Sequence, residues 1–148
     1  RGRKAITTQP TREPDLRADL VERDFTADAP NRLWVADIPP QAGGAPSYVR
    51  AFSGWVYVAF VTDVHSRRII GWQTTYRPAC TDLAAGALQM AVWQRKRQGV
   101  DLSGLIHHSD RGVQYRSIRY GQALADCEAV ASVGSKGDLL SASLWPRR

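Results

Sequence analysis

Short runs of bulky apolar residues, separated by polar or glycine-rich turns, dominate the 148-residue sequence and predict a series of buried strands. The run at 31–38 is continuous, which is typical of a strand covered on both faces. The runs at 54–63 and 68–74 are rich in β-branched and aromatic residues and flank a short polar turn, so they predict a β-hairpin. Two further strands are predicted from Leu105 and at 129–133, and residues 48–51 are compatible with an additional short one.

Two segments show helical spacing instead of strand alternation. The first is predicted at 81–98, because Thr81 is a suitable N-cap, cations occupy the last turn and Gly99 follows the end. The second is predicted at 117–128. Because the first helix lies between strands, it is expected to cross over and set the strand at Leu105 parallel to an earlier one. This order predicts the α/β class, with a mixed five-stranded sheet and flanking helices.

The two ends of the chain lack this patterning. Residues 1–30 are basic at their start and interrupted by prolines, with room for a short helical turn at 15–25. We interpret 1–30 as a linker from a missing N-terminal DNA-binding module, the alternative being a disordered leader. Residues 31–138 form the predicted core. The last residues, 139–148, have no clear pattern.

Composition and charge narrow the function. A hydrophobic content of 43% with five tryptophans is typical of a globular domain, and 148 residues suffice for one core. The net charge of +6 and the isoelectric point of about 9.8 favour a polyanionic partner, with nucleic acid as the first candidate. Cys80 and Cys127 lack metal or redox spacing and fit a reducing cytosol. No apolar run reaches membrane-spanning length.

Two aspartates occupy positions where strands end. Asp37 interrupts the first apolar run, and Asp110 follows the run that begins at Leu105, with Gly112 allowing the backbone to turn away. A carboxylate in such a strand is costly unless it is paired, hydrogen-bonded or bound to metal. Ligands of α/β sheets bind outside the carboxyl ends of strands. Alternatively, Asp110 caps a helix or pins a turn, which are the commoner roles of a lone aspartate.

Two such carboxylates can serve as the protein ligands of divalent metal. Mg²⁺ prefers oxygen ligands and typically takes one or two carboxylates plus substrate phosphates. Two metal ions can activate the attacking oxygen and stabilise the leaving oxygen in phosphodiester displacement. A basic chain with carboxylates at Asp37 and Asp110 therefore indicates a DNA- or RNA-processing enzyme. The two residues are 73 positions apart, so only the fold can bring them together.

Other polar residues have two interpretations each. His107 and His108 either orient Asp110 or approach phosphate, or they are simply polar residues at a strand end. Asp63, together with Ser66, most simply shapes the hairpin turn, and the alternative is a catalytic role for Asp63. The cations at the end of the first helix form a DNA-backbone patch or complement the helix dipole. These cations are Arg95, Lys96 and Arg97.

Six short segments of the sequence contain the strands and polar residues described above, and they occur in the order of a known family. They are 31–37, 54–63, 66–72, 105–112, 114–115 and 132–138. Together they resemble the catalytic core of the retroviral-integrase-like transposases of the insertion-sequence-3 family. The resemblance implies a ribonuclease-H-like fold and a DDE triad of acids that binds two Mg²⁺ or Mn²⁺ ions. It also implies cleavage and transfer of DNA strands at transposon ends. Asp37 matches the first acid and Asp110 the second, and Lys136 is a candidate DNA contact.

Two departures from the family pattern affect the expected site. Residues 39–45 look like an insertion that lengthens a loop beside it. The third acid, a glutamate that the family carries on a later helix, is absent, since the match stops at Asp138 and no acidic residue follows. We hypothesise a frameshift in 139–148. The segment 144–147 can be encoded as CTA-TGG-CCG-AGA, which contains ATG-GCC-GAG (Met-Ala-Glu) in another frame, and incompatible codons would remove the hypothesis.

The resulting hypothesis is a transposase catalytic-core fragment that binds metal weakly and, without the third acid, is inactive in strand transfer. Its expected partners are transposon-end and target DNA in the bacterial cytoplasm, and another copy of itself or a full-length transposase, with no membrane association. The alternative is a non-catalytic DNA-binding or regulatory remnant of a transposase. A ribonuclease-H-like nuclease shares the expected fold but also requires a third acid.

Overall fold

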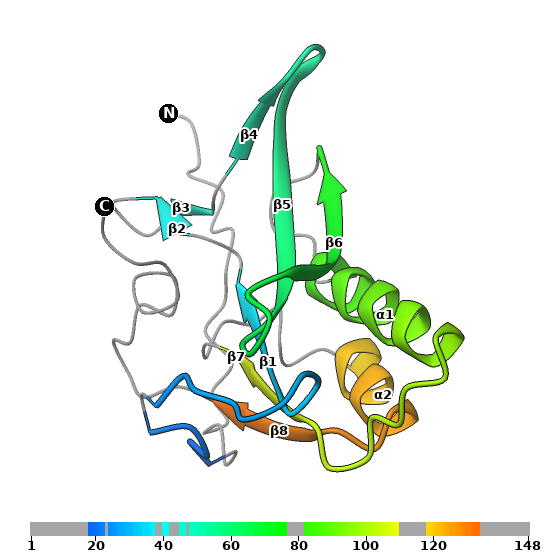
Figure 1. Cartoon of the computed structure of the whole chain (residues 1–148). Helices are drawn as coiled ribbons and strands as arrows, with labels where there is room; N and C mark the ends of the chain where they lie inside the picture. Colours follow the sequence, from blue (N-terminus) through cyan, green and yellow to red (C-terminus); the bar gives the residue numbers. More distant parts are fainter. Residues whose placement is uncertain are drawn as a thin grey trace.

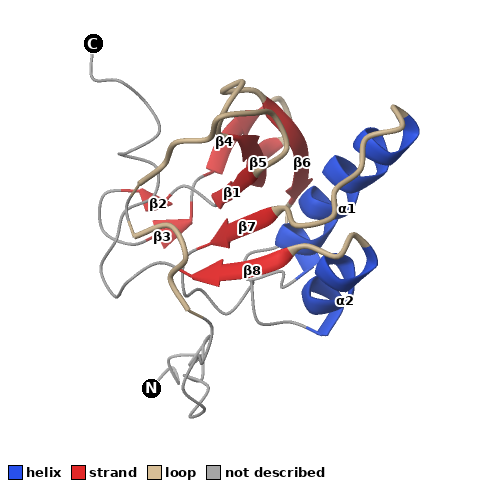
Figure 2. Ribbon diagram, turned by 60° about the horizontal axis from the view of Figure 1, so that its bottom comes forward, coloured by secondary structure: helices blue, strands red, loops and turns tan. Residues whose placement is uncertain are grey.

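The computed structural model describes residues 18–22, 24–37, 40–41, 45–46, 48–76, 82–109 and 118–133. Across these ranges, two helices pack on one face of a six-stranded mixed sheet (Figures 1 and 2). The strands are β1 (Leu33–Asp37), β4 (Tyr48–Ala51), β5 (Gly54–Asp63), β6 (Ile69–Thr75), β7 (Ile106–Ser109) and β8 (Val130–Val133). The helices are α1 (Asp82–Arg97) and α2 (Ile118–Asp126), and β2 (Pro40–Gln41) pairs separately with β3 (Ala45–Pro46). Neither described helix is long and apolar enough to cross a membrane.

Strand β5 organises one half of the sheet, because it is ten residues long and pairs along both edges. Strand β6 runs antiparallel to it on one edge, which confirms the predicted hairpin. On the other edge, β1 pairs with residues 60–63 and β4 pairs with residues 54–57. The sheet therefore has six strands instead of the predicted five, because the additional short strand allowed at 48–51 is present as β4. Strand β1 is too short to cover β5, and β4 pairs with the part that β1 leaves.

Parallel pairing builds the other half of the sheet. Strand β7 lies parallel to β1, and β8 lies parallel to β7. Helix α1 lies between β6 and β7 in the chain, which confirms the predicted crossover, and both helices agree with their predicted ranges to within two residues. The short helical turn expected at 15–25 is wrong for the described residues 18–22 and 24–25, which contain only bends and a turn.

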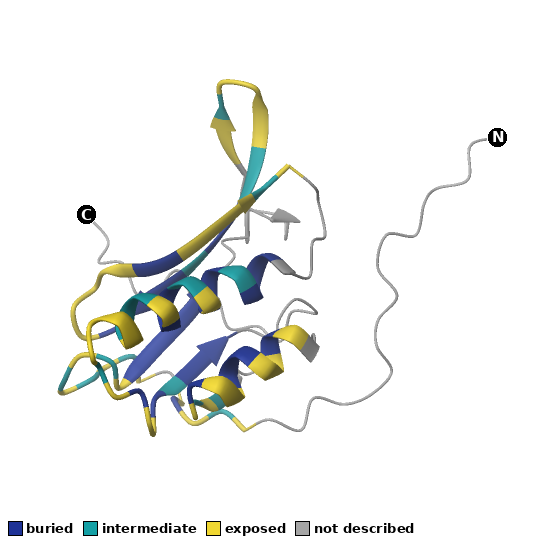
Figure 3. Ribbon diagram, turned by 90° about the vertical axis from the view of Figure 1, so that its right-hand side faces the viewer, coloured by how far each residue is buried: buried dark blue, intermediate teal, exposed yellow. Residues whose placement is uncertain are grey.

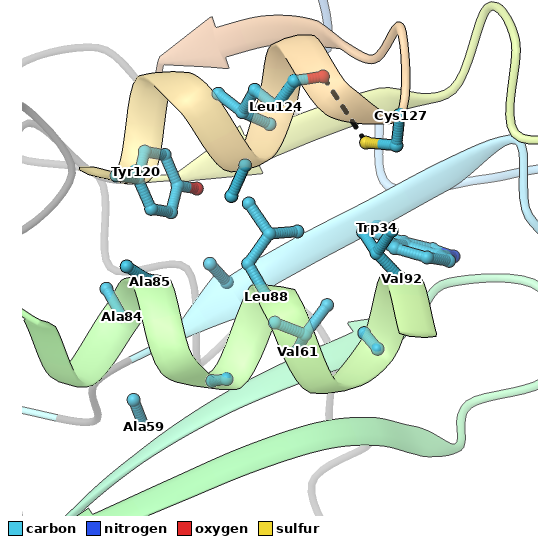
Figure 4. Packing of buried hydrophobic residues seen from close by; sticks show 14 of the residues in the cluster. Trp34, Ala59, Val61, Ala84, Ala85, Leu88, Val92, Tyr120, Leu124 and Cys127 are labelled. Carbon is cyan, nitrogen blue, oxygen red and sulfur yellow. Dashed lines mark hydrogen bonds between the residues drawn. The ribbon is translucent and has the colours of Figure 1, made fainter. Parts of the chain in front are cut away.

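Strand β1 is buried on both faces, as its continuous hydrophobicity predicted. Trp34 lies on the helix side, inside the apolar cluster that α1 and α2 share with the sheet (Figures 3 and 4). Val35 lies on the opposite side and packs with Val21. Val21 belongs to the N-terminal segment, which we define as residues 18–22 and 24–28. Water is therefore excluded from both sides of the strand that ends at the first predicted acid.

Helix α1 approaches the sheet most closely at Gly71 of β6. A Cβ atom at this position would collide with the carbonyl oxygen of Ala87 and would lie 2.8 Å from the Cβ of Ala91, both in α1. Glycine inside a strand often marks such a close approach of another backbone. The absence of a side chain at Gly71 therefore sets how closely α1 packs on the sheet.

Substitution of Gly71 tests this contact. Gly71→Ala is expected to lower the free energy of unfolding by about 1–3 kcal/mol, because the added methyl group forces α1 away from β6. Urea denaturation followed by circular dichroism measures the change. Gly121→Ala is the control, since a Cβ there meets nothing within 4 Å and alanine favours the helix by about 0.5–1 kcal/mol. A Gly71→Ala protein as stable as the parent would contradict the close packing.

Candidate active site at the carboxyl ends of β1 and β7

The two predicted acids belong to the ends of neighbouring central strands. Asp37 is the last residue of β1, and β7 ends at Ser109, one position before Asp110. The strands pair in parallel from Leu33 with Ile106 onward, and the offset between partners stays at 73 positions (106 − 33 = 73). The structure thus brings the carboxyl ends of β1 and β7 side by side. Asp110 itself lies outside the described residues.

His107 lies in the core on the helix side of the sheet. Its side chain is 1% exposed, and its Nδ1 lies 2.6 Å from the hydroxyl oxygen of Tyr120 in α2. The two rings meet edge to face, with centroids 5.5 Å apart. These contacts connect β7 to α2 and keep the imidazole out of the solvent. A phosphate would bind on the solvent side, which the imidazole does not reach.

His108 is buried against two segments, β8 and the N-terminal segment. Its Nδ1 lies 2.8 Å from the Oγ of Ser132 in β8, and that oxygen accepts a hydrogen bond from the backbone N–H of Leu20 at 2.8 Å. The Phe25 ring packs edge-on against the imidazole, with centroids 5.6 Å apart. We call this arrangement the His108–Ser132 junction. It joins the end of β7 to β8 and to the N-terminal segment.

Burial decides between the two interpretations of these histidines. Both rings are 1% exposed and bonded within the protein, which favours support of the strand end before Asp110 over contact with phosphate. Sequence reasoning missed their partners Tyr120 and Ser132, and it missed Leu20, whose backbone N–H bonds to Ser132. Ser132 carried a usable signal, because a hydroxyl inside an apolar strand needs a buried partner. Tyr120 and Leu20 carried none, since tertiary contacts alone select them.

Asp63 serves the β5–β6 turn, as predicted. Its side chain is fully buried, and its carboxylate accepts hydrogen bonds from the backbone N–H groups of Asn31 at 2.9 Å and of Ser66 at 3.0 Å. The Ser66 hydroxyl donates a third hydrogen bond at 2.6 Å. One carboxylate oxygen therefore holds the turn through Ser66, and the other fixes the backbone at Asn31, just before β1.

The cationic end of α1 lies far from the end of β1 that carries Asp37. Strands β1 and β6 both run antiparallel to β5, so they end at the same end of the sheet. Helix α1 begins near that end, because it follows β6 in the chain. The 16 residues of α1 extend about 24 Å back toward the opposite end, where β7 begins. The structure therefore does not bring the cations of its last turn beside Asp37. The remaining predicted DNA contact, Lys136, lies outside the described residues.

The three cations of α1 make local contacts. Lys96 Nζ donates a hydrogen bond to the carbonyl oxygen of Asp126, at the end of α2, at 2.8 Å. The guanidinium of Arg97 lies 5.0 Å from the centroid of the Trp93 ring. Arg95 Nη1 donates to a neighbouring glutamine side chain at 2.9 Å. These contacts favour the helix-end interpretation of the cations over a DNA-backbone patch.

Two described groups have clearly shifted pKa values, and both lie outside the candidate site. The backbone N–H of Ser103, aided by its hydroxyl, holds the pKa of the exposed Asp101 carboxyl below its usual value. Burial raises the pKa of the Cys127 thiol, which donates to the carbonyl oxygen of Leu124 at 3.3 Å. In the part of the chain that the structure describes, no group of three or more His, Cys, Asp or Glu side chains is placed to hold a metal ion.

Comparison with known proteins establishes the family. The sequence model of the integrase core domain family matches residues 27–138. The chain belongs to this family. Members of the family generally use divalent metal ions and act on DNA.

Curated relatives of this integrase core domain are transposases. A putative transposase for insertion sequence element IS986/IS6110 of Mycobacterium tuberculosis is 44% identical over 138 residues, which cover 93% of this chain and 46% of that protein. Transposase InsF for insertion sequence IS3A of Escherichia coli is 40% identical over 119 residues, which cover 80% of this chain and 37% of that protein. The predicted relationship to insertion-sequence-3 transposases is confirmed, and the chain spans less than half the length of these relatives.

The fold also has a solved counterpart. A chain of a simian T-cell lymphotropic virus intasome, solved with a PP2A regulatory subunit, matches 78% of this chain with a TM-score of 0.56 and 16% identity. The match covers 36% of that chain, and at this identity the likeness concerns the fold alone. Together with the mixed sheet and its helices, it confirms the predicted ribonuclease-H-like fold of integrase catalytic cores.

Removal of the Ser132 hydroxyl tests the His108–Ser132 junction. Ser132→Ala is expected to lower the free energy of unfolding by about 1–3 kcal/mol, because two hydrogen bonds lose their shared oxygen. The Leu20 amide is expected to exchange its hydrogen faster in the variant, as measured by NMR. Ser103→Ala removes an exposed hydroxyl and is expected to stay within about 0.5 kcal/mol of the parent. Equal stability of the two variants would contradict the role of the junction.

Proposed function

We propose that this integrase core domain is the catalytic-core part of a transposase that cleaves and transfers DNA strands at the ends of an insertion sequence. The family match and the transposase relatives support this class of reaction. Because the chain spans less than half of those relatives, the activity of a whole transposase is itself part of the proposal. The net charge of +6 suits a polyanionic substrate.

Asp37 and Asp110 are the proposed metal-binding acids, and the strand register is the observation that carries this assignment. The constant offset between β1 and β7 equals the 73 positions that separate the two aspartates. A parallel ladder continued two positions past the pair Val35 and His108 makes Asp37 and Asp110 level on adjacent strands. Their backbones would then lie about 4.8 Å apart, which is the ordinary spacing of paired strands.

Two carboxylates on level positions of adjacent strands fit Mg²⁺ or Mn²⁺, which bind oxygen ligands and retain several waters. Metal ions held there would polarise the reacting phosphodiester and stabilise the leaving oxygen. The contribution of the chain itself is to fix the positions of the acids. Strand β1 is packed on both faces, and the His108–Ser132 junction holds the end of β7, so neither strand end has to reorganise when substrate binds.

The missing third acid limits this site. Residues 139–148, where the resemblance places the third acid, contain no Asp or Glu, and the ligand set proposed for these 148 residues therefore contains two carboxylates instead of three. Fewer charged ligands bind a divalent cation more weakly. We therefore expect weak metal binding and no efficient strand transfer from the chain with its present tail at 139–148.

Substitution of Asp37 tests the metal assignment. Calorimetric titration with Mn²⁺ is expected to show weak binding to the parent and a loss of affinity of about tenfold or more in Asp37→Asn, because a neutral amide is a poorer ligand than a carboxylate. Asp101→Asn is the matched control, since Asp101 is an exposed carboxylate that precedes β7 and is bonded to Ser103. This control is expected to bind Mn²⁺ like the parent.

Two outcomes of the titration would contradict the assignment. Equal affinities of the parent and Asp37→Asn would show that Asp37 is not a ligand. A parent that binds duplex DNA but no Mn²⁺ would favour the non-catalytic DNA-binding or regulatory remnant instead.

A strand-transfer assay tests the requirement for a third acid. Incubation of the chain with a transposon-end duplex and Mn²⁺ is expected to yield little or no joined product, because one of the three family acids is missing. Gel separation of labelled strands measures the product. Robust strand transfer by the chain as it stands would overturn the expected inactivity.

A further inference from the structure

Strand β4 and the first residues of β5 form a two-stranded arm that projects from the sheet (Figures 1 and 3). We call residues 48–57 the β4–β5 arm. Phe52 and Ser53 form its turn, and Gly54 follows with a φ of +129°, a conformation that other residues rarely adopt. The Oγ of Ser53 lies 2.7 Å from the hydroxyl oxygen of Tyr76, which braces the tip against the end of β6.

The arm leaves the sheet at the end that carries the candidate site. Asp37 pairs with Phe60, and β5 runs antiparallel to β1. The six residues from Ala59 back to Gly54 therefore continue beyond the end of β1. At about 3.3 Å per residue they reach about 20 Å past Asp37. Substrate bound at the carboxyl ends of β1 and β7 would extend alongside the arm.

The arm exposes large apolar side chains next to a cation. Phe52 at the turn is fully exposed, and Trp55 and Val49 are 58% and 54% exposed. Arg50 is also exposed and pairs directly across the ribbon with Trp55, so a guanidinium and an indole share one face. Val49 pairs with Val56 and so lies on the other face of the ribbon. Large apolar groups exposed at the tip and on both faces of a projecting ribbon mark it as an element that contacts another molecule.

We propose that the β4–β5 arm docks onto the duplex DNA that flanks the reacting phosphodiester, an inference that rests on the function proposed above. A two-stranded β-ribbon fits into a DNA groove. Phe52 at the tip packs against a base step, as apolar wedges of DNA-binding proteins do. Arg50 contacts a backbone phosphate. The arm thereby fixes the duplex while the strand ends at Asp37 hold the reacting bond.

Charge and size favour DNA over a second copy of this chain. The sequence between Asp37 and Asp63 contains no acidic residue and one cation, Arg50, so the arm offers a polyanion no repulsion. A second copy would bring another net charge of +6 to the same surface. The ten residues of the arm also fall short of the roughly 20–30 residues a side of a standard protein interface.

Fluorescence anisotropy with a labelled duplex of mixed sequence, measured over a series of salt concentrations, tests the docking. Phe52→Ala is expected to weaken binding about tenfold without changing the salt dependence, because the lost contact is to a base. Arg50→Ala is expected to weaken binding and to reduce the slope of log affinity against log salt by about one. A duplex containing 2-aminopurine is expected to brighten with the parent and not with Phe52→Ala.

Trp93→Ala provides the matched control. Trp93 is 58% exposed, like Trp55, but it lies on α1, away from the arm. It is expected to bind the duplex as the parent does. Circular dichroism verifies that each variant remains folded, which is expected because all the substituted side chains are exposed.

The outcomes separate this inference from the proposed function. Duplex binding by the parent that survives both Phe52→Ala and Arg50→Ala would remove the role of the arm and leave the proposed function standing. A loss in Trp93→Ala as large as that in Phe52→Ala would also overturn the inference. Absence of duplex binding by the parent would overturn both proposals. A dimer in sedimentation that Phe52→Ala abolishes, with DNA binding unchanged, would assign the arm to a second copy.

Discussion

The parallel pairing of β1 with β7 lies at the centre of the sheet, and the rest of the fold is built around it. The pairing is stable because apolar side chains exclude water from both faces of β1. Parallel strands are stable mainly where apolar layers cover them on each side. Here α1 and α2 cover the face that carries Trp34, and the N-terminal segment covers the face that carries Val35. The positions of the strand ends are thus held by apolar contacts two or three residues away from them.

The same alternation explains why two consecutive histidines have different partners. Neighbouring residues of a strand point to opposite faces, so His107 meets α2 while His108 meets β8 and the N-terminal segment. Each imidazole has a hydroxyl partner, which offsets the cost of burying a polar ring. Strand β7 is consequently fastened on both sides just before its carboxyl end. In the sequence, His107 and His108 look like residues of a solvent-exposed reactive site, but in the structure both side chains lie in the interior.

Local patterning was sufficient for the strands β1, β5, β6, β7 and β8 and for both helices, because their apolar periodicity and end signals coincide. It also indicated a short strand at 48–51, where β4 lies. It did not place β4 in the sheet, because β4 pairs with the part of β5 that β1 leaves uncovered, and a difference in length between pairing partners is not visible in either strand alone. Asp37 and Asp110 were singled out because a carboxylate inside or at the end of an apolar run is unusual, and their role as metal ligands stays a prediction. The role of the cations at the end of α1 was ambiguous in the sequence. Only the direction of α1 shows that they lie at the end of the sheet opposite to Asp37; they are Arg95, Lys96 and Arg97.

The hydrogen bond from Leu20 to Ser132 joins residues 112 positions apart in the sequence. On the ribosome, the N-terminal segment is made long before β8, and at about 5–20 residues per second roughly 6–22 seconds separate the two. Throughout that interval one side of β1 lacks its finished cover. The nascent chain therefore presents an apolar surface to chaperones and to neighbouring chains until β8, the last of the described strands, secures the N-terminal segment.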